Sequence, residues 1–185
     1  MQALIASGLM LPFEGTVYRA MRLEYSSPEN AVSGDGAARW GGRWNPPGLP
    51  TFYASTTYEV AHREMAAAGK YYGASVTTEL PRVEAAFDVR LAKTLDLSTR
   101  AALRQMRVTQ KSLRAVDWRK ANDGGHEALT QAIGRLAAAL GVQGLIVPSA
   151  EIRGGRNLIV FPGHLAPGSH IQPMGLDKLR GLFSH

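Results

Sequence analysis

The residues with the clearest chemical potential lie between Arg39 and Glu64, in a segment that combines cations, aromatic rings and a carboxylate. Arg43 follows two glycines, Tyr53 ends a short apolar run, and Glu64 comes eleven residues later. A guanidinium group binds phosphate, a tyrosine ring packs on a flat heterocycle, and a carboxylate binds sugar hydroxyls and stabilises a developing positive charge. Together these residue types suit a nucleotide whose glycosidic bond is to be cleaved.

Two carboxylates lie on the helix that is expected to begin at residue 56. Thr56 and Glu59 match a Thr-x-x-Glu capping box, and this role accounts for Glu59. Glu64 lies farther along, beside a helical face of small and apolar residues: Val60, Ala61, Met65 and Ala68. Because a carboxylate beside such a face loses hydration, Glu64 is a functional acid, a surface glutamate at the edge of the face, or the partner of a nearby arginine.

The other candidate side chains also have both functional and structural interpretations. Arg19, Arg39 and Arg43 could point to one anionic site, or their stems could simply pack on neighbouring tryptophans. Tyr53 suits a core position as well as a ligand platform. Ser149 follows an apolar strand, and its hydroxyl could bind a phosphate or a carboxamide or satisfy the backbone of the turn. The five histidines show no metal-binding spacing, so we expect no metal site.

Composition predicts a single domain over residues 1–185. The chain is 45% hydrophobic and 19% charged, and its length is sufficient to bury a core. It contains no cysteine, which excludes disulfides, thiol nucleophiles and cysteine-based zinc sites. No apolar run approaches the roughly 20 residues that a membrane helix needs, and no basic region precedes the short apolar N-terminal stretch. We therefore expect a cytoplasmic protein without membrane association.

The net charge of +6 suits an anionic small molecule, an acidic protein partner or a nucleic acid. The basic residues are densest between positions 100 and 120, but neither a Gly-aromatic RNA-binding signature nor zinc-finger spacing accompanies them. A basic nucleic-acid-binding growth inhibitor stays open as an alternative. It would require the basic residues to cluster on one face and binding to weaken steeply with salt.

Local patterns predict an α+β fold with a mixed β-sheet core flanked by helices. Strands are expected at residues 15–20, 49–54, 143–147 and 157–161, and in the stretch 74–91 with a turn at Pro81. Helices are expected at 56–68 before Gly69, at 98–115 with Ser98 as cap, and at 126–140 before Gly141. The last helix would bury one apolar face, formed by Leu129, Ile133, Leu136 and Leu140. The polar, glycine-containing residues 24–38 predict a loop.

Six short motifs follow one another between about residues 16 and 165. They are Tyr18-Arg19, Gly42-Arg43-Trp44-Asn45 with Pro47-Gly48, Tyr53-x-Ser55, Glu64, Val147-Pro148-Ser149-Ala150, and Arg156-Asn157-Leu158 leading to Phe161-Pro162. In this order they resemble the RES-domain family, toxins of bacterial toxin–antitoxin pairs. No single motif is specific, whereas the ordered set is. The chain departs from the family after Glu64, where it continues MAAAGKYYG in place of the apolar segment common there.

The resemblance implies a fold similar to that of ADP-ribosyltransferases and an activity that consumes NAD+. By motif position it implies that Arg43, Tyr53 and Glu64 are the catalytic residues. It also implies that Arg19, Ser149 and Asn157 bind NAD+ in the same pocket. Glu64 would stabilise the oxocarbenium-like transition state, Tyr53 would stack on nicotinamide or ribose, and the arginines would hold the pyrophosphate.

A toxin of this family also implies a partner, a cognate antitoxin that is acidic where it docks, covers the pocket and provides any contact with nucleic acid. The acceptor of ADP-ribose stays open between water, inorganic phosphate and a protein side chain. A dedicated protein ADP-ribosyltransferase is therefore an alternative. It would need a loop beside the pocket that docks the target protein, for which residues 24–38 and 69–75 are candidates.

Overall fold

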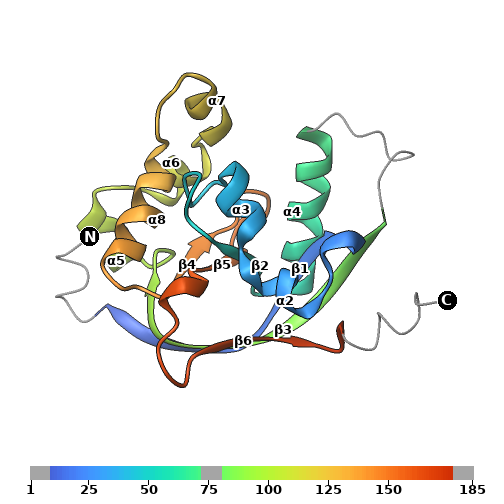
Figure 1. Ribbon diagram of the computed structural model, residues 1–185. Helices are drawn as coiled ribbons and strands as arrows, with labels where there is room; N and C mark the ends of the chain where they lie inside the picture. Colours follow the sequence, from blue (N-terminus) through green and yellow to red (C-terminus); the bar gives the residue numbers. More distant parts are fainter. Residues whose placement is uncertain (1–8, 72–80, 177–185) are drawn as a thin grey trace.

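The protein folds around one strongly curved β-sheet, as seen in a computed structural model that describes residues 9–71 and 81–176 (Figure 1). The strands are β1 Met10–Arg22, β2 Phe52–Ser55, β3 Arg82–Asp96, β4 Gly144–Pro148, β5 Arg156–Val160 and β6 His170–Met174. Their order in the sheet is β1-β2-β5-β4-β3-β6, and β1 also pairs with β3. The first five strands in this order therefore close into a ring, and β6 extends β3 outside it.

The two long strands set the shape of the sheet. β1 and β3 pair antiparallel from Met10↔Leu95 to Arg22↔Arg82, with a register shift between Leu11 and Phe13. β3 also runs parallel to β4, while β2 and β5 are antiparallel. Alternate residues of β3 are buried, as expected for a strand with one face toward a core: Ala85, Phe87, Val89 and Leu91.

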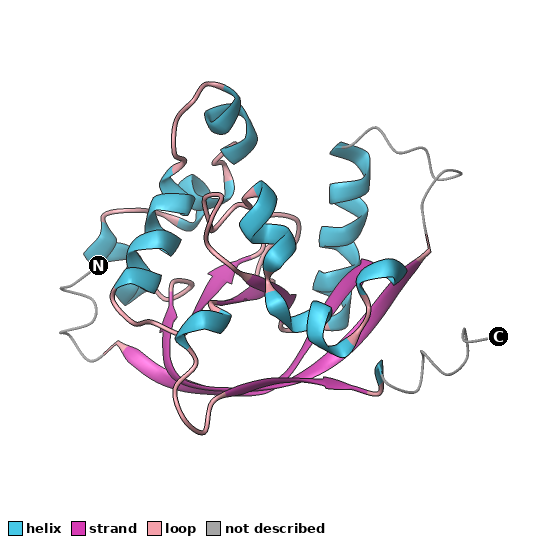
Figure 2. Ribbon diagram, in the orientation of Figure 1, coloured by secondary structure: helices cyan, strands magenta, loops and turns pink. Residues whose placement is uncertain are grey.

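The helices gather on one side of the curved surface formed by β1, β3 and β6 (Figure 2). They are α2 Pro28–Ser33, α3 Asp35–Trp40, α4 Tyr58–Tyr71, α5 Arg100–Met106, α6 Gln110–Arg114, α7 Trp118–Asp123 and α8 Leu129–Ala139. Short 3-10 turns lie at Leu23–Tyr25 and Pro162–His164. Among the described helices, none is both long and apolar enough to cross a membrane.

Strand β5 separates two hydrophobic clusters. Leu158 and Val160 belong to a cluster with Phe52 and Phe87, whose rings meet edge to face at 5.1 Å between centroids. Ile159 faces the other cluster, which packs beneath α5, α6 and α8. Successive side chains of a strand point to opposite faces, so this central strand buries both of its faces. The predicted mixed sheet with flanking helices is confirmed.

The strand predictions at 49–54, 143–147 and 157–161 are confirmed as β2, β4 and β5. The strand at 15–20 is the central part of the longer β1, and residues 82–91 form the first part of β3. Residues 74–80 lie outside the described residues, and β6 was not predicted. The loop expected at 24–38 was wrong, because α2 and most of α3 fall there. Ser27, whose hydroxyl accepts a hydrogen bond from the N–H of Asn30, caps α2.

The helix expected at 98–115 is two helices. Arg107 ends α5 with a left-handed backbone (φ 55°), and Thr99 rather than Ser98 caps it. The expected capping box of α4 was also wrong, because Thr57 accepts the hydrogen bond from Val60 N–H at 3.3 Å, while the Thr56 hydroxyl donates to the backbone of strand β5. Glu59 is exposed, and α4 continues past Gly69 to Tyr71.

The leucine-rich face predicted to be buried in the last helix is largely exposed. Leu129, Leu136 and Leu140 are 48%, 44% and 36% exposed, and α8 begins three residues later than expected. The helix packs through smaller side chains because it lies very close to the backbone of the segment before β2. A Cβ added at Gly134 would lie 1.7 Å from the Trp44 carbonyl oxygen. Gly141, at φ 74°, ends the helix as predicted.

Candidate active site

Glu64, on the second turn of α4, is held through one of its two carboxylate oxygens. Its Oε1 accepts hydrogen bonds from the Ser149 hydroxyl at 2.6 Å, the Asn157 side-chain amide at 2.8 Å and the backbone N–H of Ala150 at 3.2 Å. None of the residues that the structure describes donates to Oε2. The carboxylate is therefore fixed in orientation while one oxygen stays available to a ligand.

Ser149 is fully buried at the end of β4, and its hydroxyl is completely engaged. The oxygen donates to Glu64 and accepts from the backbone N–H groups of Glu151 and Ile152, both at 3.1 Å. One donor and two acceptors are all that a serine hydroxyl offers. Ser149 thus positions Glu64 and stabilises the turn that follows the strand.

Asn157 approaches Glu64 from β5 and is itself oriented by β2. Its side-chain oxygen accepts from the Ser55 hydroxyl at 2.8 Å, and its amide nitrogen donates to Glu64. Ser55 and Asn157 are direct partners in the antiparallel β2–β5 ladder, which brings their side chains together. The register between β2 and β5 therefore helps to determine the position of the Glu64 carboxylate on α4.

Glu64 lines a cavity of about 230 Å³. The lining residues are Tyr18, Arg19, Ala20, Tyr53, Ala54, Ser55, Ala61, Glu64, Met65, Arg82 and Asn157. The structure thus brings together Arg19, Tyr53, Glu64 and Asn157 from the predicted site. Ser149 is not part of the wall and reaches the site through its hydrogen bond to Glu64.

Arg19 places a positive charge in this cavity. Its guanidinium lies 5.1 Å from the centre of the Phe52 ring, and its Nη1 donates to the Ala31 carbonyl at 3.0 Å. Burial lowers the pKa of Arg19 to about 10, so the side chain is still a cation at neutral pH. The cavity that contains Glu64 on α4 therefore also contains a cation on β1 that can bind an anionic group.

Tyr53 lines the cavity while its hydroxyl is used elsewhere. The oxygen accepts from the backbone N–H of Trp44 at 2.8 Å and donates to the Asn45 side chain at 2.7 Å. Burial raises the pKa of Tyr53, so the phenol is neutral. A Cβ at Gly42 would lie 2.6 Å from this hydroxyl, which explains the need for glycine there. The ring is therefore the part of Tyr53 that is suited to a ligand.

Arg43 lies beside the cavity and outside its wall. Its Nη1 donates to the backbone carbonyls of Val116 at 2.7 Å and Arg114 at 3.4 Å, which ties it to the segment between α6 and α7. Burial lowers the pKa of Arg43, and the negative charge of Glu64 opposes this effect. Arg43 is therefore electrostatically coupled to Glu64, with one nitrogen engaged by the protein's own backbone.

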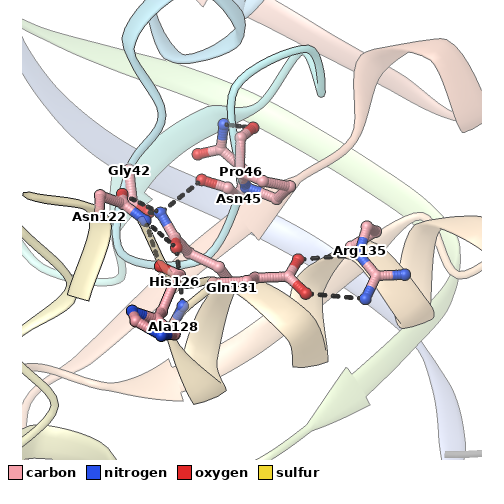
Figure 3. A network of polar contacts seen from close by, with 9 residues as sticks. Gly42, Asn45, Pro46, Asn122, His126, Ala128, Gln131 and Arg135 are labelled. Atoms are coloured by element: carbon pink, nitrogen blue, oxygen red, sulfur yellow. Dashed lines mark hydrogen bonds and ion pairs between the residues drawn. The ribbon is translucent and has the colours of Figure 1, made fainter. Parts of the chain in front are cut away.

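Sequence reasoning missed Gln131, which holds the segment that carries Arg43 (Figure 3). Gln131 is fully buried on α8, and its amide nitrogen donates to the carbonyls of Gly42 at 3.0 Å and Asn45 at 3.3 Å. It exchanges two hydrogen bonds of 2.9 Å with the Asn122 side chain, and its oxygen accepts from the N–H of Ala128 at 3.0 Å. One glutamine thus links α8 and α7 to the segment at 42–45.

Asn45 also holds the segment at 42–45 in place, through its own side chain. It is fully buried, and its amide nitrogen donates to the carbonyls of Ala37 at 2.9 Å, Pro46 at 3.0 Å and Leu49 at 3.1 Å. The available signals in the sequence were a lone asparagine before two prolines and a glutamine inside an alanine-rich helix. Neither pattern predicts the hydrogen-bond partners of these two side chains, since most of those partners lie on other elements.

The described residues offer no alternative centre built on a metal. Among residues 9–71 and 81–176, no group of three or more histidine, aspartate or glutamate side chains is placed to hold a metal ion. The polar groups of the candidate site are a carboxylate, amides, a hydroxyl and arginines.

Comparisons with known proteins show which family this chain belongs to. The family model described as the RES domain matches residues 16–178. The NAD(+) phosphorylases MbcT of Mycobacterium tuberculosis and Mycobacterium bovis are each 34% identical to this chain over 137 residues, a match that covers 71% of this chain and 66% of the relative. The structure of the M. tuberculosis MbcT–MbcA toxin–antitoxin complex matches with a TM-score of 0.71 and 25% identity, covering 97% of this chain and 96% of the other. The chain belongs to the RES-domain family, as the order of its motifs predicted.

Proposed function

We propose that this chain is the toxin of a toxin–antitoxin pair and that it cleaves the bond between nicotinamide and ribose in NAD+. The observation that carries the proposal is the Glu64 carboxylate, held by three donors through Oε1 with Oε2 available, in a cavity that also contains Arg19 and Tyr53. Relatives named NAD(+) phosphorylase in the same family support this assignment.

The chemistry follows from the charge that develops in the reaction. The bond between the ribose carbon and the nicotinamide nitrogen breaks, its electron pair leaves with nicotinamide, and the ribose becomes oxocarbenium-like. A fixed carboxylate that faces this positive charge stabilises the transition state more than the ground state. Nicotinamide leaves as a neutral molecule, so the site needs no general acid.

The other predicted residues bind and orient the substrate in this proposal. The Tyr53 ring packs on nicotinamide or ribose, and Arg19 binds the pyrophosphate. Arg43 uses the guanidinium nitrogens that are not engaged with the backbone to hold the same phosphates. Ser149 and Asn157 act through Glu64, because each gives a hydrogen bond to its Oε1.

Inorganic phosphate is the acceptor that we propose for ADP-ribose. The relatives at 34% identity are named as phosphorylases, and the chain carries a net charge of +6, which favours anionic substrates. In this reaction a phosphate oxygen bonds to the ribose carbon as nicotinamide departs. The products are nicotinamide and ADP-ribose 1-phosphate.

We further propose that a cognate antitoxin binds this chain in the cytoplasm and covers the pocket. The matching solved structure is a complex of a relative with its antitoxin. A toxin that consumes NAD+ must be restrained in the cell that makes it. The antitoxin surface should be acidic where it meets this basic protein.

The test is incubation of the purified chain, free of antitoxin, with NAD+ in the presence and absence of inorganic phosphate. We expect phosphate-dependent release of nicotinamide and a product with the mass of ADP-ribose 1-phosphate. Free ADP-ribose would identify water as the acceptor, and ADP-ribose on protein would identify a transferase. Absence of nicotinamide release would refute the proposal.

A further inference from the structure

A second, larger hollow adjoins the cavity that contains Glu64. It has a volume of about 1090 Å³ and is lined by β1, α2, α3 and α7, and we call it the tryptophan groove after Trp40 and Trp118 in its wall. Arg19 and Ala20 line both hollows, so the two lie next to each other along β1. A ligand that extends from Glu64 past Arg19 would therefore reach the groove.

The cavity at Glu64 is too small for a whole dinucleotide. Its volume is about 230 Å³, whereas pockets for small-molecule ligands typically measure roughly 300–1000 Å³. It can enclose the nicotinamide and its ribose. The pyrophosphate and the adenosine must lie elsewhere, and the groove is the adjoining space of sufficient size.

The groove offers an exposed and a half-buried tryptophan ring, each with an arginine beside it. Trp40 is 72% exposed, and the Arg39 guanidinium lies 5.0 Å from the centre of its ring. The Arg119 guanidinium lies 4.3 Å from the centre of the Trp118 ring. Aromatic side chains with neighbouring arginines are suited to stack a nucleobase and to bind the phosphates attached to it.

The charge of Arg43 interacts with one residue of each hollow, Glu64 and Arg119, although Arg43 itself lines neither. Burial has the largest effect on the pKa of Arg43, and the charges of Glu64 and Arg119 act on that pKa in opposite directions. Arg19 lines both hollows, so an anion placed between the two would lie beside its guanidinium.

We propose that the tryptophan groove binds the adenosine diphosphate half of NAD+, with the adenine stacked on Trp40 and the phosphates held by Arg19 and Arg39. This inference rests on the proposed function, because it extends the same substrate from the same site. A peptide of a protein partner or a single-stranded nucleic acid would also meet aromatic and basic side chains. The position of the groove beside a cavity too small for the dinucleotide favours the substrate itself.

Truncated substrate tests this directly. Nicotinamide mononucleotide carries the scissile bond but lacks the adenosine half. In Trp40→Ala we expect the KM for NAD+ to rise about 5- to 100-fold, the range typical for loss of one base–aromatic stack. The KM for nicotinamide mononucleotide should stay unchanged. Equal changes for both substrates, or no change for either, would overturn the proposal.

Direct binding of ADP gives a readout that does not depend on cleavage. Isothermal titration of the wild-type protein with ADP should show binding that weakens in Trp40→Ala and Arg39→Ala. Met174→Ala and Arg90→Ala are matched controls, since both residues are exposed on strands outside the groove. They should bind ADP as the wild type does.

The two proposals can fail separately. ADP binding that depends on Trp40, in a protein that releases no nicotinamide, would support the groove and reject the cleavage. Nicotinamide release with ADP binding unaffected by Trp40→Ala and Arg39→Ala would reject the groove and support the cleavage. Loss of antitoxin binding alone in these variants would assign the groove to the partner and overturn the proposal.

Discussion

Replacement of Glu64 by glutamine should separate the effect of its charge, which we propose is catalytic, from the effect of its structural hydrogen bonds. In Glu64→Gln the amide oxygen can occupy the place of Oε1 and accept the same hydrogen bonds, from Ser149, Ala150 and Asn157. The amide NH₂ then takes the place of Oε2, so the ligand meets a neutral donor in place of a negative acceptor. The fold should survive while the transition state loses its stabilisation.

The expected magnitudes differ sharply between two substitutions. Glu64→Gln should lower NAD+ turnover by about 100- to 1000-fold, as for loss of one preorganised electrostatic contact, with a melting temperature close to that of the wild type. Glu64→Ala leaves three buried or half-buried donors without an acceptor. It should therefore lose about 2–5 kcal/mol of unfolding free energy and melt roughly 5–15 °C lower.

Nicotinamide release and a thermal melt measure the two effects on the same samples. Glu59→Gln is the matched control, because Glu59 is exposed on the same helix and should affect neither quantity. Wild-type turnover in Glu64→Gln would refute the catalytic role. A melting temperature of Glu64→Gln as low as that of Glu64→Ala would show that the hydrogen bonds at Oε1 do not have the arrangement described above.

Three further substitutions test the supports of the site. Gln131→Leu leaves the Gly42 carbonyl and other buried polar groups unpaired, so denaturant titration should show that the free energy of unfolding falls by about 2–4 kcal/mol. Because the Arg43 segment then shifts, NAD+ turnover should also fall about 10- to 100-fold. Gly134→Ala would place a Cβ 1.7 Å from the Trp44 carbonyl oxygen, and the urea midpoint should fall by the equivalent of about 3 kcal/mol or more. Arg43→Lys keeps the charge but replaces the planar donor group, so most nicotinamide release should be lost while the melting temperature changes little.

Controls on the same elements make these outcomes interpretable. Leu136→Gln changes an exposed position of α8 and should leave both stability and turnover unchanged. Gly36→Ala adds a Cβ in open space on α3 and should stabilise slightly, by about 0.5–1 kcal/mol. If Gly134→Ala proves as harmless as Gly36→Ala, α8 does not approach the Trp44 backbone closely. Turnover in Arg43→Lys equal to that of the wild type would remove Arg43 from the site.

Local sequence patterns predicted the elements whose structure depends on local interactions. The apolar runs of β2, β4 and β5 and the glycine that ends α8 were correctly placed. The patterns were wrong where packing overrides periodicity. The leucines of α8 remain exposed because a contact at Gly134, between helix and backbone, turns smaller residues inward. The helices at residues 28–40 were missed because each has only six residues.

By itself, the sequence determined the family and the identity of the candidate residues, because an ordered set of short motifs is a property of the chain alone. Only the tertiary structure decided that Ser149 and Asn157, which are 85 and 93 residues away from Glu64, meet at one of its oxygens. It also decided that Gln131 holds the Arg43 segment and that a groove lies next to the cavity. Hydrogen bonds and cavities depend on distances between elements, which long-range packing sets and local periodicity does not contain.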